Sequence, residues 1–334
     1  MCSPKTVVIV HNDVGTSSSP DELDVLEQVN AVSSALQTLN FSPVRLPVTL
    51  NLEECAQRLR ALNPQMIFNL FESVESTGRF IYLAPVLLDH LRIPYTGSGT
   101  SEIFITTHKV LTKEYLTHHG LPTPKWTTAE AVCRQPDAFP FPCIVKPIWE
   151  DASVGLDSES VFYDATSIQN WIDAFHGNRD ELFVEEFVDG REFNISVLAS
   201  AQGPEVMPHA EIQFHDFPAE VPRMVGYRAK WDEYSFESQH TVRSFQTNSV
   251  DEPLLSRMSE ISLECWRKFN LKGYARVDFR VCANGQPEVL EINANPCISP
   301  DSGFVAACKQ AGVSYVEMVR RILQDIPGVN GQRK

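Results

Sequence analysis

The chain has 334 residues, 43% of them hydrophobic and 21% charged, and a formal net charge of −15 at pH 7. This length predicts two or three domains with a sizeable core, and the acidic balance argues against a broad nucleic-acid surface, which needs clustered Lys and Arg. The eight cysteines contain no C-x-x-C pair, no apolar run is long enough to span a membrane, and the N-terminus lacks a signal-peptide pattern. We therefore expect a cytoplasmic protein with reduced thiols and no nucleic-acid or membrane partner.

The first hundred residues alternate apolar strand patterns with helical patterns. Residues 7–10 and 66–70 are predicted to form buried strands. Apolar residues recur at helical spacing over residues 25–39, and residues 80–91 also favour a helix. Strands that alternate with helices are typical of a parallel sheet, so we predict a small parallel α/β domain over residues 1–100.

The pattern changes after a connecting helix, which is predicted over residues 103–119. Strand patterns then follow one another at residues 143–146, 160–163, 182–186 and 193–199, interrupted by a helix at 167–175. The last third contains a helix at 254–269, a hairpin at 274–293 and a helix at 314–323. This order favours an antiparallel α+β region, which we divide into subdomains at 101–190 and 191–330.

The hairpin places four polar side chains on one face. Asn284-Gly285 predicts a two-residue type I′ turn, and such a turn fixes the strand register. The predicted register sets Asp278 opposite Glu291 and Arg276 opposite Asn293, all on the same face because side chains alternate along a strand. The opposite face then carries Val277, Phe279 and Val281 against Ile292, Leu290 and Glu288.

Two facing carboxylates need compensation. At 4 Å they repel by about 4 kcal/mol at an effective dielectric of about 20. Mg²⁺ would supply it, because this ion takes carboxylate and amide oxygens and fills its octahedron with phosphates and water. A solvated face with Arg276 neutralising one acid is the alternative, and the hairpin alone does not decide between them.

Six segments in order resemble the D-alanine–D-alanine ligases of the ATP-grasp superfamily. They are residues 107–113, 144–147, 150–155, 184–192, 229–231, and the pair 276–278 with 290–296. The resemblance spans residues 93–324 and implies an ATP-grasp fold, in which a small N-terminal parallel α/β domain precedes two α+β subdomains that sandwich ATP.

The resemblance also implies a set of nucleotide contacts. The phosphates would be contacted by Lys109 and Lys146, and the phosphate loop would consist of Ala152, Ser153, Val154 and Gly155. Adenine would be held by Glu185, Glu186, Phe187 and Val188, and ribose would be bound by Glu192. Lys230 would cover the γ-phosphate when residues 214–245 close. Cationic side chains and small-residue loops suit phosphate, and a closing loop excludes water. A solvated lysine, a buried strand and a mobile surface loop are the simpler readings of Lys146, residues 185–188 and residues 214–245.

For the chemistry, the resemblance implies metal ligands and substrate contacts. Asp278, Glu291 and Asn293 would hold Mg²⁺, with Mn²⁺ as the alternative ion. Arg276 and the backbone N–H of Cys297 would stabilise an oxyanion, Ser302 would meet a substrate carboxylate, and Glu22 would bind the substrate ammonium, with Asp24 as its rival. The expected reaction forms an acyl phosphate and ADP, after which an amine attacks the acyl carbon.

The sequence departs from the family where substrate would bind. Residues 71–79 replace a His-Gly segment and an acidic loop, Cys297 replaces a glycine, the first loop has His11-Asn12 in place of a glycine pair, and Trp231 replaces a tyrosine. We therefore expect conserved chemistry on a substrate other than D-alanine. Cys297 is interpreted as a small residue and not as a nucleophile, because acyl-phosphate chemistry needs no thiol.

These observations lead to one hypothesis and three alternatives. The favoured hypothesis is an ATP-dependent ligase that joins small amino-acid-like or peptide-like molecules, with a homodimer as the expected assembly from the resemblance. A carboxylate kinase, a ligase that uses a nucleophile other than an amine, and a catalytically silent ATP-binding regulator stay open.

Overall fold

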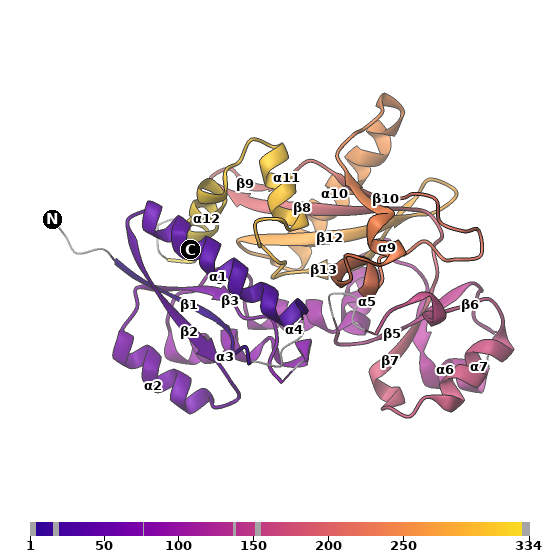
Figure 1. The fold of residues 1–334 in the computed structure, drawn as a ribbon, viewed down its shortest axis with the longest axis horizontal. Helices are drawn as coiled ribbons and strands as arrows, with labels where there is room; N and C mark the ends of the chain where they lie inside the picture. The colour runs from indigo at the N-terminus through magenta and orange to yellow at the C-terminus, as the bar shows by residue number, and fades with distance from the viewer. Residues whose placement is uncertain (1–4, 16–19, 76, 136–137, 151–154, 329–334) are drawn as a thin grey trace.

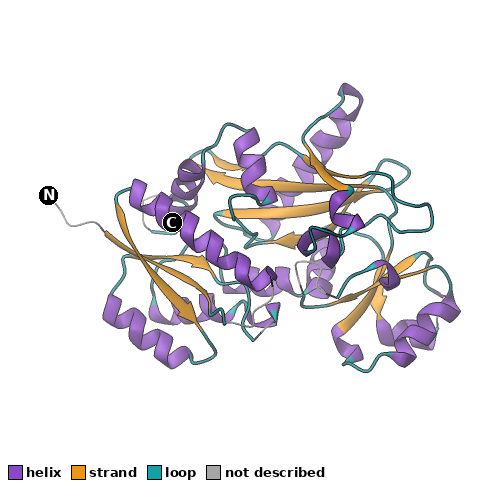
Figure 2. Cartoon of the chain, in the orientation of Figure 1, coloured by secondary structure: helices purple, strands orange, loops and turns teal. Residues whose placement is uncertain are grey.

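The computed structural model describes residues 5–15, 20–75, 77–135, 138–150 and 155–328. Three sheets lie side by side in an elongated molecule (Figure 1). The N-terminal sheet forms one end, a four-stranded sheet forms the other, and a larger sheet lies across both. Helices cover the outer faces of each sheet (Figure 2). The mixture of one parallel and two antiparallel sheets confirms the predicted fold class.

The N-terminal sheet is parallel, with β1 (Lys5–Asn12) between β2 (Phe41–Val48) and β3 (Met66–Leu70). Its helices are α1 (Pro20–Thr38), α2 (Leu52–Leu62) and α3 (Leu83–Leu91), and a 3₁₀ turn at Gly78–Phe80 precedes α3. The sequence did not predict β2, because Pro43 and Pro47 interrupt its pattern. Proline is tolerated there because β2 is an edge strand.

The connecting helix was predicted to be continuous over residues 103–119, but the structure interrupts it at His108. It forms α4 (Thr100–Thr107) and α5 (Lys109–His118), and His108 between them has φ −82° and ψ 96°. The His108 side chain accepts a hydrogen bond from the N–H of Leu111 and so caps α5. The break places Lys109 and Lys113 one turn apart on α5, on the same side of the helix.

The four-stranded sheet is antiparallel. Its strand order is β4 (Trp126–Thr128), β7 (Leu182–Glu186), β5 (Cys143–Pro147) and β6 (Val161–Phe162). Helices α6 (Ala129–Arg134) and α7 (Ala165–Ala174) and 3₁₀ turns at Ser158–Ser160 and Arg179–Glu181 complete the unit. The apolar sides of β5, β7, α6 and α7 share one small core.

The larger sheet is also antiparallel and positions most of the polar residues of interest. Its order is β11 (Thr241–Ser244), β10 (Ala210–Phe214), β8 (Arg191–Ser200), β12 (Tyr274–Val281) and β13 (Pro287–Asn293), and β9 (Gly203–Val206) also pairs with β8. Helix α10 (Glu252–Lys268), which follows a 3₁₀ turn at Ser249–Asp251, covers its apolar face. Two short helices, α8 (Tyr227–Trp231) and α9 (Phe236–Gln239), stand at the other face, and α11 (Gly303–Gln310) and α12 (Tyr315–Gln324) end the fold.

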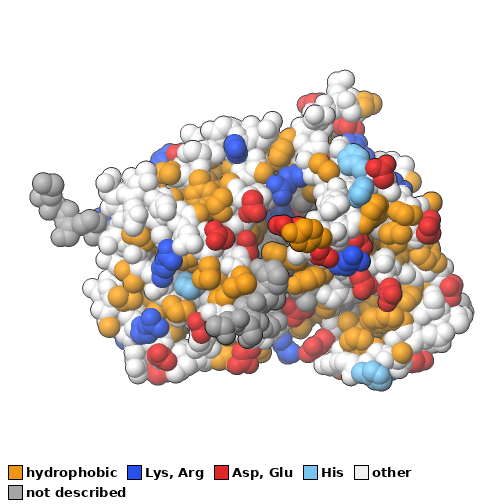
Figure 3. All heavy atoms as spheres, viewed as in Figure 1, with side chains coloured by type: hydrophobic (Ala, Val, Ile, Leu, Met, Phe, Trp, Pro, Cys, Tyr) orange, Lys and Arg blue, Asp and Glu red, His pale blue; other side chains and the backbone are white. Residues whose placement is uncertain are grey.

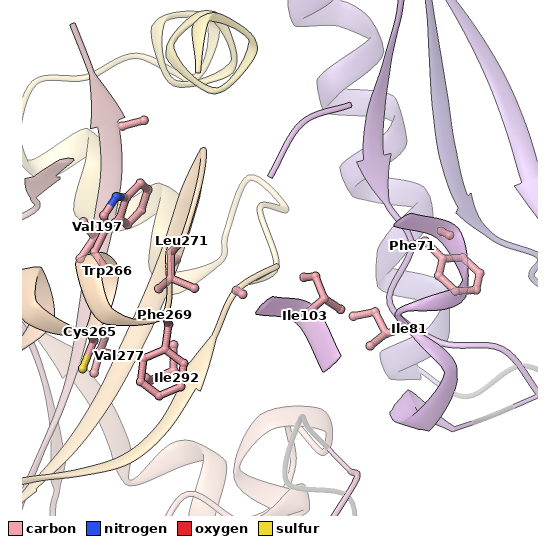
Figure 4. Packing of buried hydrophobic residues seen from close by; sticks show 14 of the residues in the cluster. Phe71, Ile81, Ile103, Val197, Cys265, Trp266, Phe269, Leu271, Val277 and Ile292 are labelled. Carbon is pink, nitrogen blue, oxygen red and sulfur yellow. The ribbon is translucent and has the colours of Figure 1, made fainter. Parts of the chain in front are cut away.

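Two hydrophobic clusters join the sheets to one another. In the first, Ile103 of α4 lies between Phe71 and Ile81 on one side and the apolar residues of the large sheet, such as Val277, on the other (Figure 4). The second packs α1, β1 and β3 against α11 and α12, with Tyr274 fully buried within it. Each predicted segment, 1–100, 101–190 and 191–330, contains one sheet, but these two clusters cross its borders, and the division stays a prediction.

The hairpin turn differs from the prediction by one residue. Cys282 donates its N–H to the Gln286 carbonyl at 2.8 Å, and Gly285 has φ +81°, so the loop has three residues and ends in a left-handed glycine. A β-bulge between Asp278 and Phe279 then shifts the register back by one residue. The predicted pairs Asp278–Glu291 and Arg276–Asn293 are therefore confirmed, although the turn was wrong.

The pairs nearer the turn were predicted incorrectly. Phe279 faces Val289 and not Leu290, and Val281 faces Pro287 and not Glu288. Val289 is fully buried in the core. Leu290, the extra residue of the bulge, lines a cavity on the polar side of the sheet. The bulge thus keeps Glu288 off the apolar face, where the predicted register had placed it.

No helix in the described parts of the chain is long and apolar enough to cross a lipid bilayer. The seven cysteines within those parts are all free thiols.

Candidate active site

A cavity of about 870 Å³ opens where the three sheets meet. Acidic and basic side chains gather around the hollow (Figure 3). It is lined by thirteen of the predicted site residues, namely Lys146, Gly155, Glu185, Glu186, Phe187, Val188, Glu192, Lys230, Arg276, Asp278, Glu291, Asn293 and Ser302. Lys109 does not line it, residues 152–154 lie outside the described residues, and of Glu22 only its place in the first turn of α1 is described.

The two facing acids of the hairpin both point to this cavity and each has a cationic neighbour. Arg276 Nε and Nη2 donate to the two carboxylate oxygens of Asp278 at 2.8 and 2.7 Å. Lys109 Nζ donates to Glu291 Oε2 at 2.9 Å. Asn293 lies beside them, and its Oδ1 accepts from the N–H of Asn295 at 2.9 Å. The charges of the two acids are thus balanced within the protein.

The two acids have different electrostatic surroundings. Burial raises the pKa of Asp278 above its ordinary value, although Arg276 acts in the opposite direction. Burial also disfavours the charge of Glu291, but Lys109, Lys230 and Arg276 together hold its pKa well below the ordinary value. Glu291 is therefore the more firmly ionised member of the pair.

This donor set fits a hard divalent cation. Two carboxylates and one amide leave one face of the hairpin together, and such oxygen donors suit Mg²⁺, which keeps its other positions for phosphate oxygens and water. Among the described residues, His, Cys, Asp and Glu do not gather in groups of three or more that could hold a metal. An ion that shares its coordination with a bound triphosphate does not require such a group.

A buried chain of charges connects α5 to the four-stranded sheet. Glu185 is 1% exposed and forms ion pairs with both Lys113 and Lys146, the latter at 2.5 Å. Lys113 Nζ also donates to Thr123 Oγ1 at 3.0 Å and to the Leu290 carbonyl at 3.3 Å. The pKa of Glu185 is lowered by both lysines against the effect of burial, and burial lowers the pKa of Lys113.

Lys113 is one of the residues that the predicted site omitted. Both Lys109 and Lys113 belong to the first of the resembling segments, and the resemblance implies a phosphate contact for Lys109. The structure places Lys109 beside Glu291, whereas Lys113 is joined through Glu185 to Lys146 at the cavity wall. The spacing of four residues was the available signal, since it sets both lysines on one side of a helix.

An apolar slot occupies the side of the cavity nearest the four-stranded sheet. Ile144, Phe187, Met224 and Leu290 line it, and the first three belong to or pack against one small cluster. Two of the backbone donors predicted for adenine are already used, because the N–H of Glu186 and of Phe187 bond to the carbonyls of Lys125 and Pro142 at 2.8 and 2.9 Å. Glu185 is paired within the sheet with Trp126 and Ile144, so Val188 is the residue of the predicted hinge that lies beyond both the strand and these hydrogen bonds.

Glu192 is a further acid in the wall of this cavity. It is 8% exposed and lines the cavity, and Arg280 donates to its carboxylate at 2.7 Å. Arg280 also donates to the Gly190 and Arg223 carbonyls at 2.9 and 2.6 Å. Arg280 therefore fixes the orientation of Glu192, a role that the sequence did not reveal.

The predicted phosphate-loop glycine and closing segment both reach the cavity. Gly155 has φ +73°, a conformation that favours glycine, and it lines the cavity wall. Lys230 and Trp231 end the short helix α8, which is linked to the same wall because the Tyr227 N–H donates to the Leu156 carbonyl at 3.1 Å. Lys230 thus lines the same cavity as Lys146 and the hairpin acids.

The end of the cavity beyond the hairpin is cationic on one side. Arg276 lines it together with Arg243 of β11, which donates to the Asp301 carbonyl at 3.4 Å and lies against Gly303. Ser302 caps α11, with its hydroxyl accepting from the Val305 N–H at 3.3 Å. Two guanidinium groups and a helix N-terminus together suit a carboxylate. From the sequence, residues 214–245 are expected only to form a closing loop, which assigns no role to Arg243.

The other side of that end is acidic. Asp24 and Glu72 both line the cavity, and Gln28 Nε2 donates to Asp24 Oδ2 at 3.2 Å and to Glu72 Oε1 at 2.9 Å. Cys297 Sγ lies 2.9 Å from Asp24 Oδ2 and 3.0 Å from Ser299 Oγ. Asp24, the rival of Glu22, thus lines this acidic side together with Glu72, whereas the Glu22 side chain lies outside the described part of the structure.

The thiol of Cys297 should be inert although it lines the cavity. Burial raises the pKa of Cys297 well above its ordinary value, and Glu72 and Asp24 add to the effect. Because the thiolate is the reactive form, we expect iodoacetamide at pH 7.5 to alkylate Cys297 at least about tenfold more slowly than a free cysteine. Peptide mass spectrometry over a time course would measure this, with the half-buried Cys133 as the internal control. Equal rates at both cysteines would contradict it.

Comparisons with known proteins agree with this geometry. The family model described as "D-ala D-ala ligase C-terminus" matches residues 114–324. An uncharacterized Sinorhizobium fredii protein, y4sG, is 30% identical over 259 residues, which cover 77% of this chain and 73% of that protein. The D-alanine–D-alanine ligase of Aquifex aeolicus is 28% identical over 315 residues, which cover 93% and 98%.

Solved structures share the fold. A D-alanine–D-alanine ligase from Bacillus anthracis superposes with a TM-score of 0.74 at 21% identity, covering 96% of this chain and 97% of that one. A structure of that ligase complexed with ATP gives a TM-score of 0.73. The VanG D-Ala:D-Ser ligase from Enterococcus faecalis gives 0.72 at 16% identity, covering 96% and 99%.

Proposed function

Because the chain belongs to the D-alanine–D-alanine ligase family and is an ATP-dependent carbon–nitrogen ligase, we propose that it joins two small amino-acid-like molecules through an acyl phosphate. One observation carries this proposal: the facing acids Asp278 and Glu291 share a cavity with Lys146 at one end and with Arg276 and Ser302 at the other. A nucleotide and a carboxylate substrate can therefore meet at the hairpin.

The nucleotide end is assigned from its shape and charge. The slot of Ile144, Phe187, Met224 and Leu290 suits a purine ring, and Glu192 suits ribose hydroxyls. Lys146, Lys230 and the backbone at Gly155 would contact phosphate oxygens. We assign Lys113 a positioning role, since it holds Glu185 and through it Lys146.

Asp278, Glu291 and Asn293 would hold Mg²⁺, which neutralises phosphate charge when bound. Arg276 and Lys109 form ion pairs with these acids and so neutralise part of their negative charge. Arg276 also lines the end of the cavity that contains Arg243 and Ser302, which we assign to the substrates. There it can donate to the oxygen of a developing tetrahedral intermediate, the kind of preorganised contact that lowers barriers most. Ser302 and Arg243 would hold the carboxylate of the second substrate.

The substrate end supports a substrate other than D-alanine. Cys297 fills the place where the family resemblance expects a glycine, and its thiol lies against Asp24. Glu72 comes from the segment that replaces the family loop, and it lines the same wall. The reaction chemistry is thus proposed to be that of the family, with altered specificity.

The decisive experiment is a coupled ADP-release screen with Mg²⁺ and ATP over pairs of small amino acids and dipeptides. We expect ADP release that depends on both a carboxylate and an amine, and a new amide by mass spectrometry. ADP release that needs only a carboxylate would instead identify a carboxylate kinase. Bound ATP without turnover across the screen would contradict the ligase proposal and favour a regulator.

Lys146→Ala should weaken nucleotide binding. The variant removes a phosphate cation from the cavity and leaves Glu185 with Lys113 alone. A hydrogen bond to a charged group contributes about 1.5–3 kcal/mol, so we expect the Kd for ATP to rise by about tenfold or more. Isothermal titration calorimetry would measure it, with Lys125→Ala, outside the cavity lining, as the control. Wild-type affinity in Lys146→Ala would remove Lys146 from the site.

A homodimer is the proposed assembly, on the family resemblance alone. Light scattering on the purified protein would test it, because a dimer has twice the 37.5 kDa mass of the chain. A single species at the monomer mass over the working concentration range would overturn it.

A further inference from the structure

Arg280 is a buried arginine in the wall of the cavity, beside the apolar slot. It lies on β12 two residues beyond Asp278, and side chains alternate along a strand. Arg276, Asp278 and Arg280 therefore form one polar row along β12. The Arg280 side chain is 4% exposed, and a charge so deeply buried needs acceptors that hold it.

Three acceptors hold the Arg280 guanidinium, and they come from three separate segments. Nη2 pairs with Glu192 Oε2 at 2.7 Å, and Glu192 lies directly opposite Arg280 on the neighbouring strand β8. Nη1 donates to the Gly190 carbonyl, in the loop before β8, at 2.9 Å. Nη2 also donates to the Arg223 carbonyl, ahead of α8, at 2.6 Å. One side chain thus joins the predicted hinge, the predicted ribose acid and the start of the closing segment.

The surroundings of Arg280 leave its guanidinium little freedom. The rings of Phe187 and Phe214 have their centres 6.0 and 5.5 Å from the guanidinium carbon, within the range of a cation–π contact. Gly190 lies directly on the end of β12, because a Cβ at this position would collide with the Val281 carbonyl. A planar guanidinium with donors in fixed directions, enclosed in this way, holds Glu192 in one orientation.

The contact with the Arg223 carbonyl ties the slot to the same cation. Met224, the next residue, packs against Ile144 and lines the cavity. Arg280 therefore fixes the carboxylate proposed for ribose relative to the apolar wall proposed for the purine ring. A nucleoside that fills the slot would present its sugar to Glu192.

We propose that Arg280 is a positioning residue that makes the site select ribose over deoxyribose. It holds Glu192 so that this carboxylate accepts a hydrogen bond from a ribose hydroxyl of the bound nucleotide. The ion pair uses Oε2, and no other side chain of the described residues pairs with this carboxylate. A nucleotide without the hydroxyl leaves a buried acceptor unpaired, which lowers its affinity. The inference rests on the nucleotide end of the proposed function and deepens it.

Calorimetric titration of ADP, 2′-deoxy-ADP and 3′-deoxy-ADP with Mg²⁺ tests the inference without any amino-acid substrate. We expect the wild-type protein to bind ADP at least about tenfold more tightly than one of the deoxy forms, the ratio that one hydrogen bond to a charged group supports. Arg280→Met should lose most of this preference, because the Kd for ADP rises toward that for the deoxy form. Arg280→Lys should have an intermediate preference, because one ammonium cannot hold Glu192 and both carbonyls in the geometry of the guanidinium.

Arg191→Met is the matched control. Arg191 lies on β8 of the same sheet and pairs with Glu211 and Asp251, and all three residues lie outside the cavity lining. Its loss should leave the preference for ADP at the wild-type level. A purely structural or charge effect of Arg280 would weaken all three nucleotides by the same factor, so the ratio of Kd values separates positioning from stability.

Three outcomes overturn the inference while leaving the nucleotide site intact: equal binding of the three nucleotides by the wild-type protein, an unchanged preference in Arg280→Met, or an equal loss of preference in Arg191→Met. If circular dichroism shows that Arg280→Met does not fold, Arg280→Lys decides, because a wild-type preference in the lysine variant overturns the inference. Absence of binding of every nucleotide by the wild-type protein would instead overturn the proposed nucleotide end, and this inference with it.

Discussion

Asp278→Asn and Glu291→Gln are each expected to lower kcat by at least about a hundredfold while the fold stays intact. In phosphoryl transfer, positioning and charge neutralisation supply most of the catalysis, and loss of one preorganised contact costs about 10²–10³ in rate. The two acids face each other across β12 and β13 and are neutralised by Arg276 and Lys109. Each substitution removes one negative charge beside these cations and one ligand from the proposed Mg²⁺ site.

The measurement is ADP release under saturating ATP, with circular dichroism to confirm folding. Glu288→Gln is the matched control, since it changes an acid on the same strand that does not line the cavity. The control should retain wild-type kcat. Undiminished turnover in both Asp278→Asn and Glu291→Gln would remove these acids from the metal site.

Glu185→Gln is expected to destabilise the protein by about 3–5 kcal/mol, the cost of breaking a buried ion pair from one side. The carboxylate is 1% exposed and joins Lys113 and Lys146, and Lys113 is itself fully buried. Removing the negative charge leaves two cations without compensation. Urea unfolding followed by tryptophan fluorescence would report a lower midpoint with an unchanged slope.

The control for this prediction is Glu181→Gln, because the Glu181–Arg79 pair is about half exposed and such pairs contribute about 0–1 kcal/mol. A second variant, Lys113→Met with Glu185→Gln, should recover part of the lost stability. If Glu185→Gln unfolds at the wild-type midpoint, the network does not stabilise the fold.

The ion pairs of Glu185 with Lys113 and Lys146 also predict that the free energy of unfolding decreases as the pH falls into the acidic range. The folded pKa of Glu185 lies below its ordinary value, so its contribution is present above the unfolded pKa and is lost as pH falls through the folded pKa. In Glu185→Gln this contribution is absent at every pH. The stability difference between the two proteins should therefore shrink as the pH is lowered, and urea midpoints across the acidic range would show it.

Helices and strands in which apolar residues recur at a regular spacing could be predicted from the sequence. The polar face of the hairpin could be predicted in the same way. Asp278 and Glu291 face each other as expected, but only because a longer turn and a bulge offset one another. A turn signal such as Asn-Gly states that the chain reverses and leaves the loop length open. The bulge has no sequence signature of its own, and its residue Leu290 is an ordinary strand former.

The site was less predictable where tertiary contacts decide it. Lys109 and Lys113 are equivalent by sequence, and only the break at His108 and the packing of α5 assign one to Glu291 and the other to Glu185. Asp24 reaches the substrate end through its contacts with Gln28 and Cys297, which lie 4 and 273 residues away. Arg243 lies in a segment without hydrophobic period, so no local pattern could place it.

The packing of α1 against α11 and α12 ties the order of synthesis to the order of folding. The core around Val7, Val29 and Phe68 is completed by Phe304 and Met318, from the last tenth of the chain. During translation, part of the apolar face of the first sheet stays exposed until those residues have been synthesised. Contacts between residues so far apart in the sequence slow folding, and the exposed surface favours binding by chaperones. Loss of the final helix would consequently expose apolar residues of the N-terminal sheet, which is synthesised first and lies far from the nucleotide slot.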